Sequence, residues 1–578
     1  MKLLKLLPIV AIALLTSCGN AQQGAEEKHL SAADSLSLAK NDKTQHPELN
    51  RGTNKEITDD NYDKAMAVKC ANGTFVGKSY DNYRAWRGIP FAKAPVGELR
   101  WKAPVAPDNS DKVFEAYTFA LKPIQFFTDE DVSEDCLYLN IYESGEQTAE
   151  KKPVMVWIHG GGFLAESASD ELYRGEDFIA NNPDVILVTI EYRLGAFGFM
   201  CFEDVPGGEE YKDAGVLGLL DQICALKWVK NNIAQFGGDP NNVTIFGESA
   251  GSGSSTSLPL FADAKGLFNR IIGQSCAPNV AYPKEDRKFT TVNLLKVTGA
   301  KTMEDLKKVP ADSIYAHYFE IAGGANPFAP IRDGVNLPFT IEESIAKWKE
   351  AVKGLDIMIG YTAHEARYCL STWMGLDEDK GVNFFNNSYN LLKTDKSKYN
   401  IPAEAFAASD EYIKNCKLPK EWERVERMFT IADFAVPTIA YVDSYCDNGN
   451  VYVYVMNLPA QTDLAGSYHS CDVEYIFNHK DRLAAFGRTD DLTKQRADEV
   501  QRLWVSFAKT GVPSLDGKEF KKYDTKDKAI LVIDHKDGFS SQDHYIDEEV
   551  KALMPVLPYA HYYLMESFAL NMDKAEKK

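Results

Sequence analysis

Short apolar runs recur along the chain after about residue 150, separated by more polar stretches. They contain three to six residues and cover 154–158, 185–190, 243–246, 357–359, 451–456 and 529–533. Continuous apolar runs of this length are typical of strands that are buried on both faces. The pattern therefore predicts six buried strands.

Helical spacing lies between several of these runs. Apolar residues over 220–228 line one face of a helix that is expected to end near Gly237, and those over 500–507 line another that ends at Gly511. This alternation predicts the α/β class, with a large mostly parallel central sheet, helices on both faces and long insertions. Residues 61–578 contain no internal repeat and no Pro/Gly-rich linker, so we expect a single domain there.

The first 18 residues have the pattern of an export signal. Two lysines precede an apolar run over 6–15, which is shorter than the roughly 20 residues that a membrane-spanning helix needs. The segment ends in Leu15-Thr16-Ser17-Cys18, which resembles a bacterial lipobox. We therefore expect residues 1–17 to be removed and Cys18 to be lipidated. The alternative is an ordinary signal peptide with an incidental cysteine.

Residues 18–60 are rich in small and polar residues and poor in large apolar ones. Such a stretch cannot bury enough surface to offset its ordering entropy, so we expect a flexible tether. No later apolar stretch is long enough to span a bilayer, and membrane contact is expected through the lipid anchor alone. Because Gly19–Gln22 lack the acidic residues that accompany surface export, we expect an exported, lipid-anchored protein on the periplasmic side of the bacterial cell envelope.

Composition narrows the classes of function. Of the 578 residues, 44% are hydrophobic and 26% are charged, as in packed globular proteins. With 64 Lys+Arg against 84 Asp+Glu, the formal net charge is −20, which argues against binding to nucleic acid. The ten cysteines form no CxxC pair and no zinc-finger spacing, so no metal site is expected.

A nucleophile motif follows the third apolar run directly. Gly247-Glu248-Ser249-Ala250-Gly251 is a G-x-S-x-G sequence, and the small residues over 252–257 suit the start of a helix. A serine on a strand–turn–helix elbow of this kind is the nucleophile of many hydrolases. The alternative is a structural serine in a tight turn. The context favours Ser249 as a nucleophile.

A second motif offers donors for an oxyanion. His159-Gly160-Gly161-Gly162 follows the first apolar run, and consecutive glycines allow backbone N–H groups to converge on one point. The N–H of Ala250, one residue beyond Ser249, completes the expected oxyanion hole.

The serine also needs a base and an acid that follow it in the chain. His469 lies 13 residues after the run that ends at residue 456, and Glu365 lies five residues after Gly360. Both positions suit the carboxyl edge of the sheet. His364 and His479 remain rivals as the base, because spacing alone does not exclude them.

Several segments together resemble type-B carboxylesterases, the family that includes cholinesterases. The signature-like stretches are 133–140 (SEDCLYLN) and 246–251 (FGESAG), and other family-like segments are 87–92, 191–195 and 235–240. The similarity runs from about residue 66 to 565. It implies the α/β-hydrolase fold and hydrolysis of carboxylic esters.

The resemblance also implies roles for individual residues. The family acid in a G-x-x-x-x-E segment corresponds to Glu365, and the family histidine corresponds to His469 in the segment 468–475. With Ser249 these form the implied triad, and Gly161, Gly162 and Ala250 are the implied oxyanion donors. The expected activity is hydrolysis of small or medium carboxylic esters through an acyl-enzyme, with no metal or organic cofactor.

The chain departs from the family pattern at several positions. The segment 120–125 lacks the cysteine that usually pairs with the signature cysteine, so we expect Cys136 to be a free buried thiol. Glu166 stands where the family often has glycine, and it would place a carboxylate near the pocket rim. The loop over 126–134 contains no tryptophan, so a cage for a quaternary ammonium group is not expected.

Two other interpretations stay open at this point. The same serine chemistry serves lipases, feruloyl or acetyl-sugar esterases, and amidases, and the long loops that select among these substrates are not predictable from the motifs. The same fold also occurs in non-catalytic adhesion proteins, but those have lost the nucleophile, whereas this chain carries competent residues at all three triad positions.

Overall fold

A computed structural model describes residues 51–125, 128, 131–146, 150–322, 328–370, 378–394, 401–460, 464–479 and 490–563. The expected signal peptide, the lipidation site Cys18 and most of the expected tether lie outside these residues. Within the described part of the chain, no helix has the length and apolar character needed to cross a bilayer.

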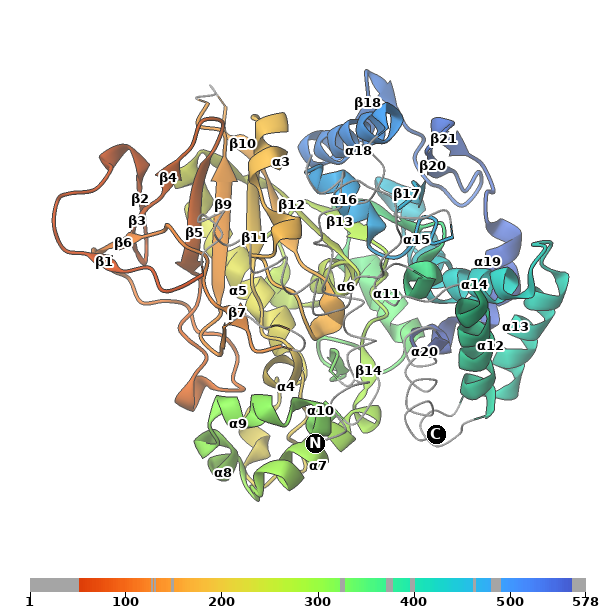
Figure 1. The fold of residues 1–578 in the computed structure, drawn as a ribbon, viewed down its shortest axis with the longest axis horizontal. Helices are drawn as coiled ribbons and strands as arrows, with labels where there is room; N and C mark the ends of the chain where they lie inside the picture. The colour runs from red at the N-terminus through yellow and green to blue at the C-terminus, as the bar shows by residue number, and fades with distance from the viewer. Residues whose placement is uncertain are drawn as a thin grey trace, which may run out of the picture.

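A twisted sheet of eleven strands forms the centre of the molecule (Figure 1). Seven adjacent strands are mutually parallel, and antiparallel strands flank them on both sides. The spatial order is β21 (Gly538–Gln542), β20 (Ile530–Asp534), β17 (Val451–Asn457), β16 (Asp356–Thr362), β13 (Arg270–Gln274), β12 (Gly238–Glu248), β10 (Lys152–Ile158), β11 (Ile186–Ile190), β9 (Tyr138–Glu143), β5 (Arg84–Pro90) and β4 (Lys78–Ser79).

All six predicted strands are present as β10, β11, β12, β16, β17 and β20, and the mostly parallel sheet is confirmed. The sequence pattern missed β13, because a glycine, a glutamine and an arginine leave only two consecutive apolar residues in Arg270–Gln274. It also missed the antiparallel flanking strands. β9, for example, mixes polar and apolar residues, as expected near the edge of a sheet.

Side chains of the central strands alternate between two hydrophobic cores, one on each face of the sheet. In β10, Val154, Val156 and Ile158 enter one core, whereas Met155 and Trp157 enter the other. The first core is covered by α5 (Leu217–Asn232), α6 (Ala250–Ser257), α11 (Ile341–Ala351) and α15 (Val436–Asp443). The second is covered by α3 (Glu176–Asn181), α16 (Cys471–Phe477) and α18 (Asp491–Thr510). The two helices predicted from spacing are α5 and α18.

Most of the remaining helices form two groups that lie away from the sheet (Figure 1). One group consists of α7 (Lys288–Thr298), α8 (Met303–Lys308), α9 (Ala311–Ala316) and α10 (Tyr318–Ala322). The other consists of α12 (Glu378–Thr394), α13 (Ala403–Asn415), α14 (Glu421–Thr430), α19 (Asp547–Leu553) and α20 (Ala560–Tyr563). These segments account for much of the predicted insertion length.

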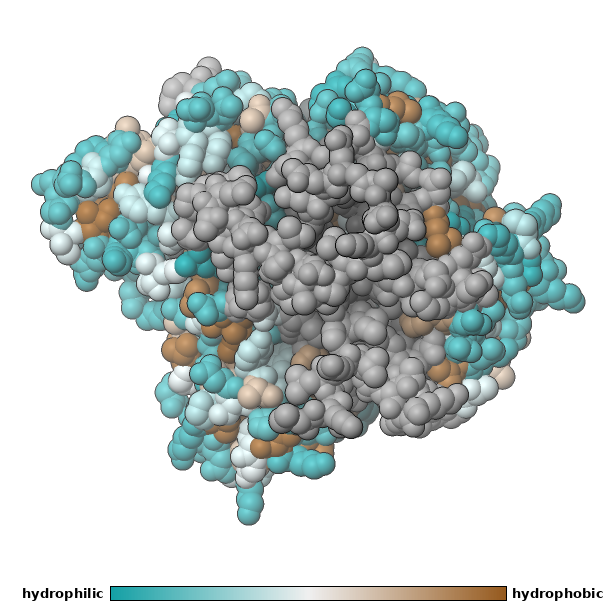
Figure 2. Space-filling model, viewed as in Figure 1, coloured by the Kyte–Doolittle hydropathy of each residue, from teal (hydrophilic) through white to brown (hydrophobic). Residues whose placement is uncertain are grey.

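The outer surface of the described residues is mainly hydrophilic on the face shown in Figure 2, with small separate hydrophobic groups. The exposed apolar side chains include Val292, Phe319 and Phe339. The hydrophilic part of this face agrees with the net charge of −20.

The folded body begins earlier than residue 61. A second, four-stranded sheet contains β1 (Glu56–Ile57), which pairs with β6 (Val113–Glu115), followed by β3 (Gly73–Val76) and β2 (Ala67–Cys70). The Asn54 amide donates to the Arg87 carbonyl oxygen at 2.7 Å and accepts from the Tyr117 and Thr118 N–H groups at 3.0 and 3.1 Å. Residues 51–60, which composition assigned to the tether, are therefore anchored by backbone and amide hydrogen bonds that composition does not reveal.

Removal of the Asn54 amide should destabilise the protein measurably. We expect Asn54→Ala to lower the free energy of unfolding by about 1–3 kcal/mol, because several backbone groups lose their hydrogen-bond partner. Urea unfolding measures the change. The matched control Asn61→Ala alters an exposed asparagine and should stay within about 0.5 kcal/mol of the wild type. Equal stability of the two variants would contradict the anchoring role of the Asn54 amide.

Candidate active site

Ser249 occupies the tight turn between β12 and α6. Its backbone has φ +55° and ψ −121°, a strained conformation for a residue with a side chain. A Cβ atom on Gly247 or on Gly251 would clash with the Ile158 carbonyl oxygen of the neighbouring strand β10. The two glycines of the motif therefore permit the close packing that holds Ser249 at the carboxyl end of the sheet.

The structure brings Ser249, His469 and Glu365 into one hydrogen-bonded series. His469 Nε2 lies 2.8 Å from Ser249 Oγ, and His469 Nδ1 lies 2.6 Å from a Glu365 carboxylate oxygen. Glu365 follows β16 and is fully buried, and its other oxygen accepts from the Thr362 N–H at 2.7 Å. His469 lies in the loop between β17 and α16. The two side chains thus come from segments that follow the carboxyl ends of β16 and β17, which are neighbouring strands.

The two rival histidines have other partners. His479 is fully buried, and its Nδ1 lies 3.3 Å from Asp177 of α3 on the other side of the sheet. His364 Nδ1 accepts from the Ser467 N–H at 3.3 Å, and burial lowers the pKa of His364 to about 3. Among the described contacts, Ser249 Oγ meets the imidazole of His469 and neither of the other two rings.

The glycine loop passes directly beside the nucleophile. Gly161 and Gly162 have φ of +76° and +62°, which favours glycine at both positions. A Cβ atom on Gly160 would lie 3.4 Å from the Ser249 Cβ, so the loop and the serine are in close contact. Ala250 is the first residue of α6, where backbone N–H groups have no intrahelical acceptor. The glycine loop and the first N–H group of α6 therefore both lie beside Ser249.

Two further buried carboxyl groups lie close to His469. A Glu248 oxygen is 3.3 Å from His469 Nε2, and the same oxygen accepts from Ser470 Oγ at 2.7 Å. Asp472 accepts from the Gln274 amide at 3.0 Å. Burial raises the pKa of Glu248 well above its usual value and raises that of Asp472 to about 7. Neither residue was singled out from the sequence, although Glu248 stands inside the nucleophile motif at the end of a buried strand.

These carboxyl groups determine the protonation of the imidazole. Burial alone would lower the pKa of His469, but the negative charges of Glu248, Glu365 and Asp472 outweigh it and raise the pKa to about 9. Only the neutral imidazole can accept a proton from Ser249. An activity that depends on this base should therefore rise with pH well beyond the ordinary titration range of histidine.

Replacement of Glu248 by glutamine should shift that pH dependence. We expect Glu248→Gln to move the rising limb of kcat/KM for a neutral ester by roughly one pH unit toward lower pH, because the variant lacks the negative charge that Glu248 carries beside the imidazole when it is ionised. A pH–rate profile of the two proteins measures the shift. The exposed Glu203→Gln, whose carboxylate pairs with Lys284, is the control and should leave the profile in place. A shift to higher pH in Glu248→Gln would contradict the electrostatic explanation.

Two aromatic rings flank the imidazole. The Phe434 ring centroid is 5.4 Å from that of His469, and the Tyr368 centroid is 6.4 Å away. Phe434 belongs to a π-helical turn over Ile431–Ala435 between α14 and α15, and such turns occur frequently at functional sites. The sequence contains no motif for this turn, so the contribution of Phe434 was not predictable.

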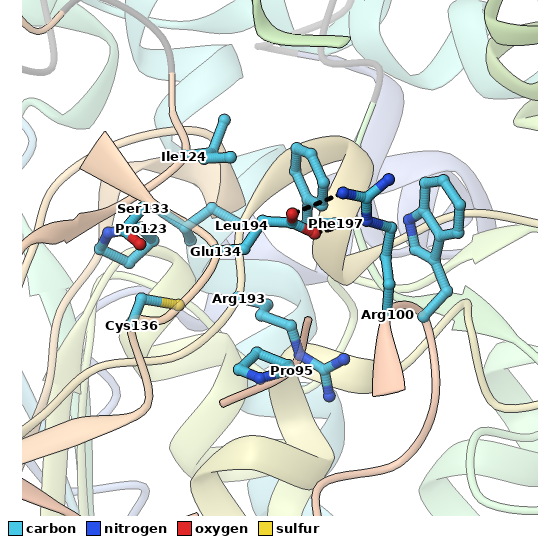
Figure 3. Close-up of a pocket in the computed structure, with 11 residues that line it drawn as sticks. Pro95, Arg100, Pro123, Ile124, Ser133, Glu134, Cys136, Arg193, Leu194 and Phe197 are labelled. Atoms are coloured by element: carbon cyan, nitrogen blue, oxygen red, sulfur yellow. Dashed lines mark hydrogen bonds and ion pairs between the residues drawn. The ribbon is translucent and has the colours of Figure 1, made fainter. Parts of the chain in front are cut away.

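A small pocket shown in Figure 3 lies apart from this site. Arg100 lines it and forms two 2.6 Å hydrogen bonds with Glu134, and Cys136 also lines it. Neither Ser249 nor His469 is among its lining residues. Cys136 is buried and free, which confirms the prediction for this thiol.

Comparison with solved structures identifies the fold. A solved structure of the carboxylesterase EST55 from Geobacillus stearothermophilus matches with a TM-score of 0.72 and 31% identity, and covers 84% of this chain and 100% of its own. A para-nitrobenzyl esterase structure matches with a TM-score of 0.69 and 30% identity over 84% of this chain and 99% of its own. The molecule is therefore an α/β-hydrolase in fold, as predicted.

Sequence comparison gives the family. The model of the carboxylesterase family matches residues 64–552. The para-nitrobenzyl esterase of Bacillus subtilis is 32% identical over 489 residues, which cover 80% of this chain and 93% of that protein. Liver carboxylesterase 1 of Mus musculus is 30% identical over 77% of this chain and 84% of its own. The chain belongs to the carboxylesterase family of enzymes, and the resemblance seen in its motifs is confirmed.

Proposed function

We propose that the protein hydrolyses small or medium carboxylic esters, with Ser249 as nucleophile, His469 as general base and acid, and Glu365 as the group that orients the imidazole. The observation that carries the proposal is the continuous series of hydrogen bonds from Ser249 through His469 to Glu365, at 2.8 and 2.6 Å. Membership of the carboxylesterase family supports carboxylic esters as the class of substrate.

The first half of the reaction forms an acyl-enzyme. Ser249 Oγ attacks the ester carbonyl carbon while His469 Nε2 takes the hydroxyl proton. The Glu365 carboxylate accepts from the Nδ1–H, fixes the tautomer and stabilises the imidazolium. Negative charge develops on the carbonyl oxygen, where the N–H groups of Gly161, Gly162 and Ala250 stabilise it. The tetrahedral intermediate then expels the alcohol, which takes its proton from His469.

The second half regenerates the serine. A water molecule attacks the acyl carbonyl carbon and gives a proton to His469, a second tetrahedral intermediate forms on the same oxyanion donors, and the bond to Ser249 Oγ breaks. His469 returns the proton to Oγ and the carboxylic acid leaves. Each proton and leaving group in this cycle is handled by groups of the chain and by water, so the mechanism calls for no metal or organic cofactor.

A panel of neutral esters tests this function. We expect hydrolysis of p-nitrophenyl acetate, butyrate and octanoate, with slower hydrolysis of the palmitate and little cleavage of the matching p-nitroanilide. A preference for the palmitate would favour a lipase, and efficient cleavage of the anilide would favour an amidase. Feruloyl and acetyl-sugar esters complete the panel. If none of these substrates is cleaved above the buffer rate, the chain is a non-catalytic member of the family.

We further propose that the protein is exported and held in the cell envelope by a lipid on Cys18, on the periplasmic side. The proposal rests on the lysines, the short apolar run and the lipobox-like end of residues 1–18. Cys18→Ser should move the protein from the detergent phase to the aqueous phase in a phase-partition experiment on expressing cells. Retention of the variant in the detergent phase would contradict the anchor.

A further inference from the structure

Glu166 departs from the family pattern and has a strained backbone. The sequence places a glutamate where the family often has glycine, and the structure shows φ +74° at this residue, in the region that favours glycine. Such strain persists only where the surrounding structure holds it, and it concentrates at functional sites. The contacts of the Glu166 side chain should therefore show what holds this residue in the strained conformation.

The side chain of Glu166 packs against Gly161 in the candidate oxyanion loop. A Cβ atom on Gly161 would lie 3.1 Å from Glu166 Cγ and 3.3 Å from its Cδ, so the glutamate packs directly against the Gly161 backbone. Its carboxylate accepts from the Tyr173 hydroxyl at 2.5 Å, and its carbonyl oxygen accepts from the Gln125 amide at 2.9 Å. Tyr173 and Gln125 are both buried, so the two contacts hold Glu166 at its side chain and at its backbone.

The carboxyl group turns inward, in contrast to the expected position at the pocket rim. Part of the residue stays accessible, but the carboxylate contacts a buried hydroxyl rather than the solvent. The contacts of the Glu166 side chain are thus with the Tyr173 hydroxyl and with the Gly161 backbone. These contacts point to an effect on the glycine loop.

We propose that Glu166 is a positioning residue, which presses on Gly161 and keeps the Gly161 and Gly162 N–H groups aimed at the developing oxyanion. The inference rests on the proposed function, because it needs an oxyanion at this loop. The hydrogen bonds from Tyr173 and Gln125 hold Glu166 in place. Its positive φ is the backbone strain that accompanies a side chain at this position.

The charge state of Glu166 adds a pH dependence. The titratable groups that face it come from the glycine loop, the segment after it and the ends of β11 and β12, and are His159, Asp170, Tyr173, Tyr192 and Glu248. Burial raises the pKa of Glu166 to about 7, against the lowering effects of Tyr173 and His159. Above this pH a negative charge lies behind Gly161 and opposes the negative charge of the oxyanion. Catalysis should therefore lose rate as Glu166 ionises.

Two substitutions separate positioning from stability. Glu166→Gly relieves the backbone strain but removes the side chain that covers Gly161. We expect its thermal unfolding midpoint to equal or exceed that of the wild type, while kcat for p-nitrophenyl acetate falls about tenfold with little change in KM, because oxyanion donors act in the transition state. Glu166→Gln keeps the size and the Tyr173 contact without the charge. Its kcat should match the wild type near pH 6 and exceed it several-fold near pH 8.

The outcomes are distinct. A wild-type kcat in Glu166→Gly, or a loss of activity that comes with an equal loss of thermal stability, would overturn the positioning role. A Glu166→Gln to wild-type ratio that is constant with pH would overturn the effect of the charge. Glu171→Gln, which removes a carboxylate that pairs with Arg174 on the same segment, is the matched control. Failure of the proposed function itself would appear separately, as an active Ser249→Ala.

Discussion

Ser249→Ala should reduce the hydrolysis of p-nitrophenyl acetate by about 10⁴- to 10⁶-fold in kcat, because the attacking oxygen is lost while the fold is retained. The alanine removes only Oγ, and the strained turn between β12 and α6 is held by the packing of Gly247 and Gly251 rather than by the hydroxyl. The thermal unfolding midpoint should therefore stay at or slightly above that of the wild type. Initial rates at saturating substrate and a thermal melt measure the two quantities.

A neighbouring serine supplies the control. Ser255 lies in α6 and its hydroxyl bonds back to the Gly251 carbonyl oxygen at 2.8 Å, so Ser255→Ala changes one buried hydroxyl on the same helix. We expect this variant to keep activity within a few-fold of the wild type. Substantial activity in Ser249→Ala would show that a different group carries the reaction.

His469→Ala and His479→Ala should differ sharply. Loss of His469 removes the only imidazole that meets Ser249 among the described contacts, and we expect kcat to fall about 10⁴- to 10⁶-fold. His479 pairs with Asp177 on the opposite side of the sheet, so His479→Ala should reduce stability by a few kcal/mol through a buried cavity and leave kcat within a few-fold of the wild type. Steady-state kinetics and urea unfolding of both variants measure this split.

The comparison of the two histidines is informative because each is buried and each follows the nucleophile. A structural loss alone would affect both variants in the same direction. If His479→Ala is the inactive protein and His469→Ala stays active, the assignment of the base is wrong.

The central strands and the nucleophile turn were predictable because their signals are local. An apolar run such as 154–158 and a turn motif such as 247–251 each depend on a few consecutive residues. The antiparallel strand β9 was not predictable, because it lacks a continuous apolar run. Its mixture of polar and apolar residues reflects its position beside the parallel strands. The ordered structure of residues 51–60 was not predictable for a similar reason. The anchoring by Asn54 depends on backbone groups more than 30 residues away in the sequence.

The candidate site was predictable only in part. Position favoured His469 but spacing did not exclude His364 or His479, and resemblance to the family singled out His469. Only the fold shows that β16 and β17 are neighbours, which brings Glu365 within 2.6 Å of the imidazole. Phe434 was missed for the same reason, because its contact with His469 joins segments that are far apart in the sequence. No local pattern reports that its ring faces His469.

The buried acids around His469 have consequences beyond the triad. Glu248 and Asp472 lie close to the imidazole, and both have a raised pKa because of burial. A protonated carboxyl adds no charge to the site, whereas an ionised one stabilises the imidazolium that forms during catalysis. The pH profile of the enzyme should therefore report the protonation of this group of residues as a unit, rather than that of one histidine.

The most direct test of the proposed chemistry is the position of a covalent label. The full chain is treated with an activated organophosphonate ester, digested, and the adduct is located by tandem mass spectrometry. We expect one phosphonyl group per molecule on Ser249, with loss of esterase activity in proportion to labelling and no adduct in Ser249→Ala. Labelling at another residue with the same loss of activity, or full activity after stoichiometric labelling of Ser249, would contradict the assignment of Ser249 as the nucleophile.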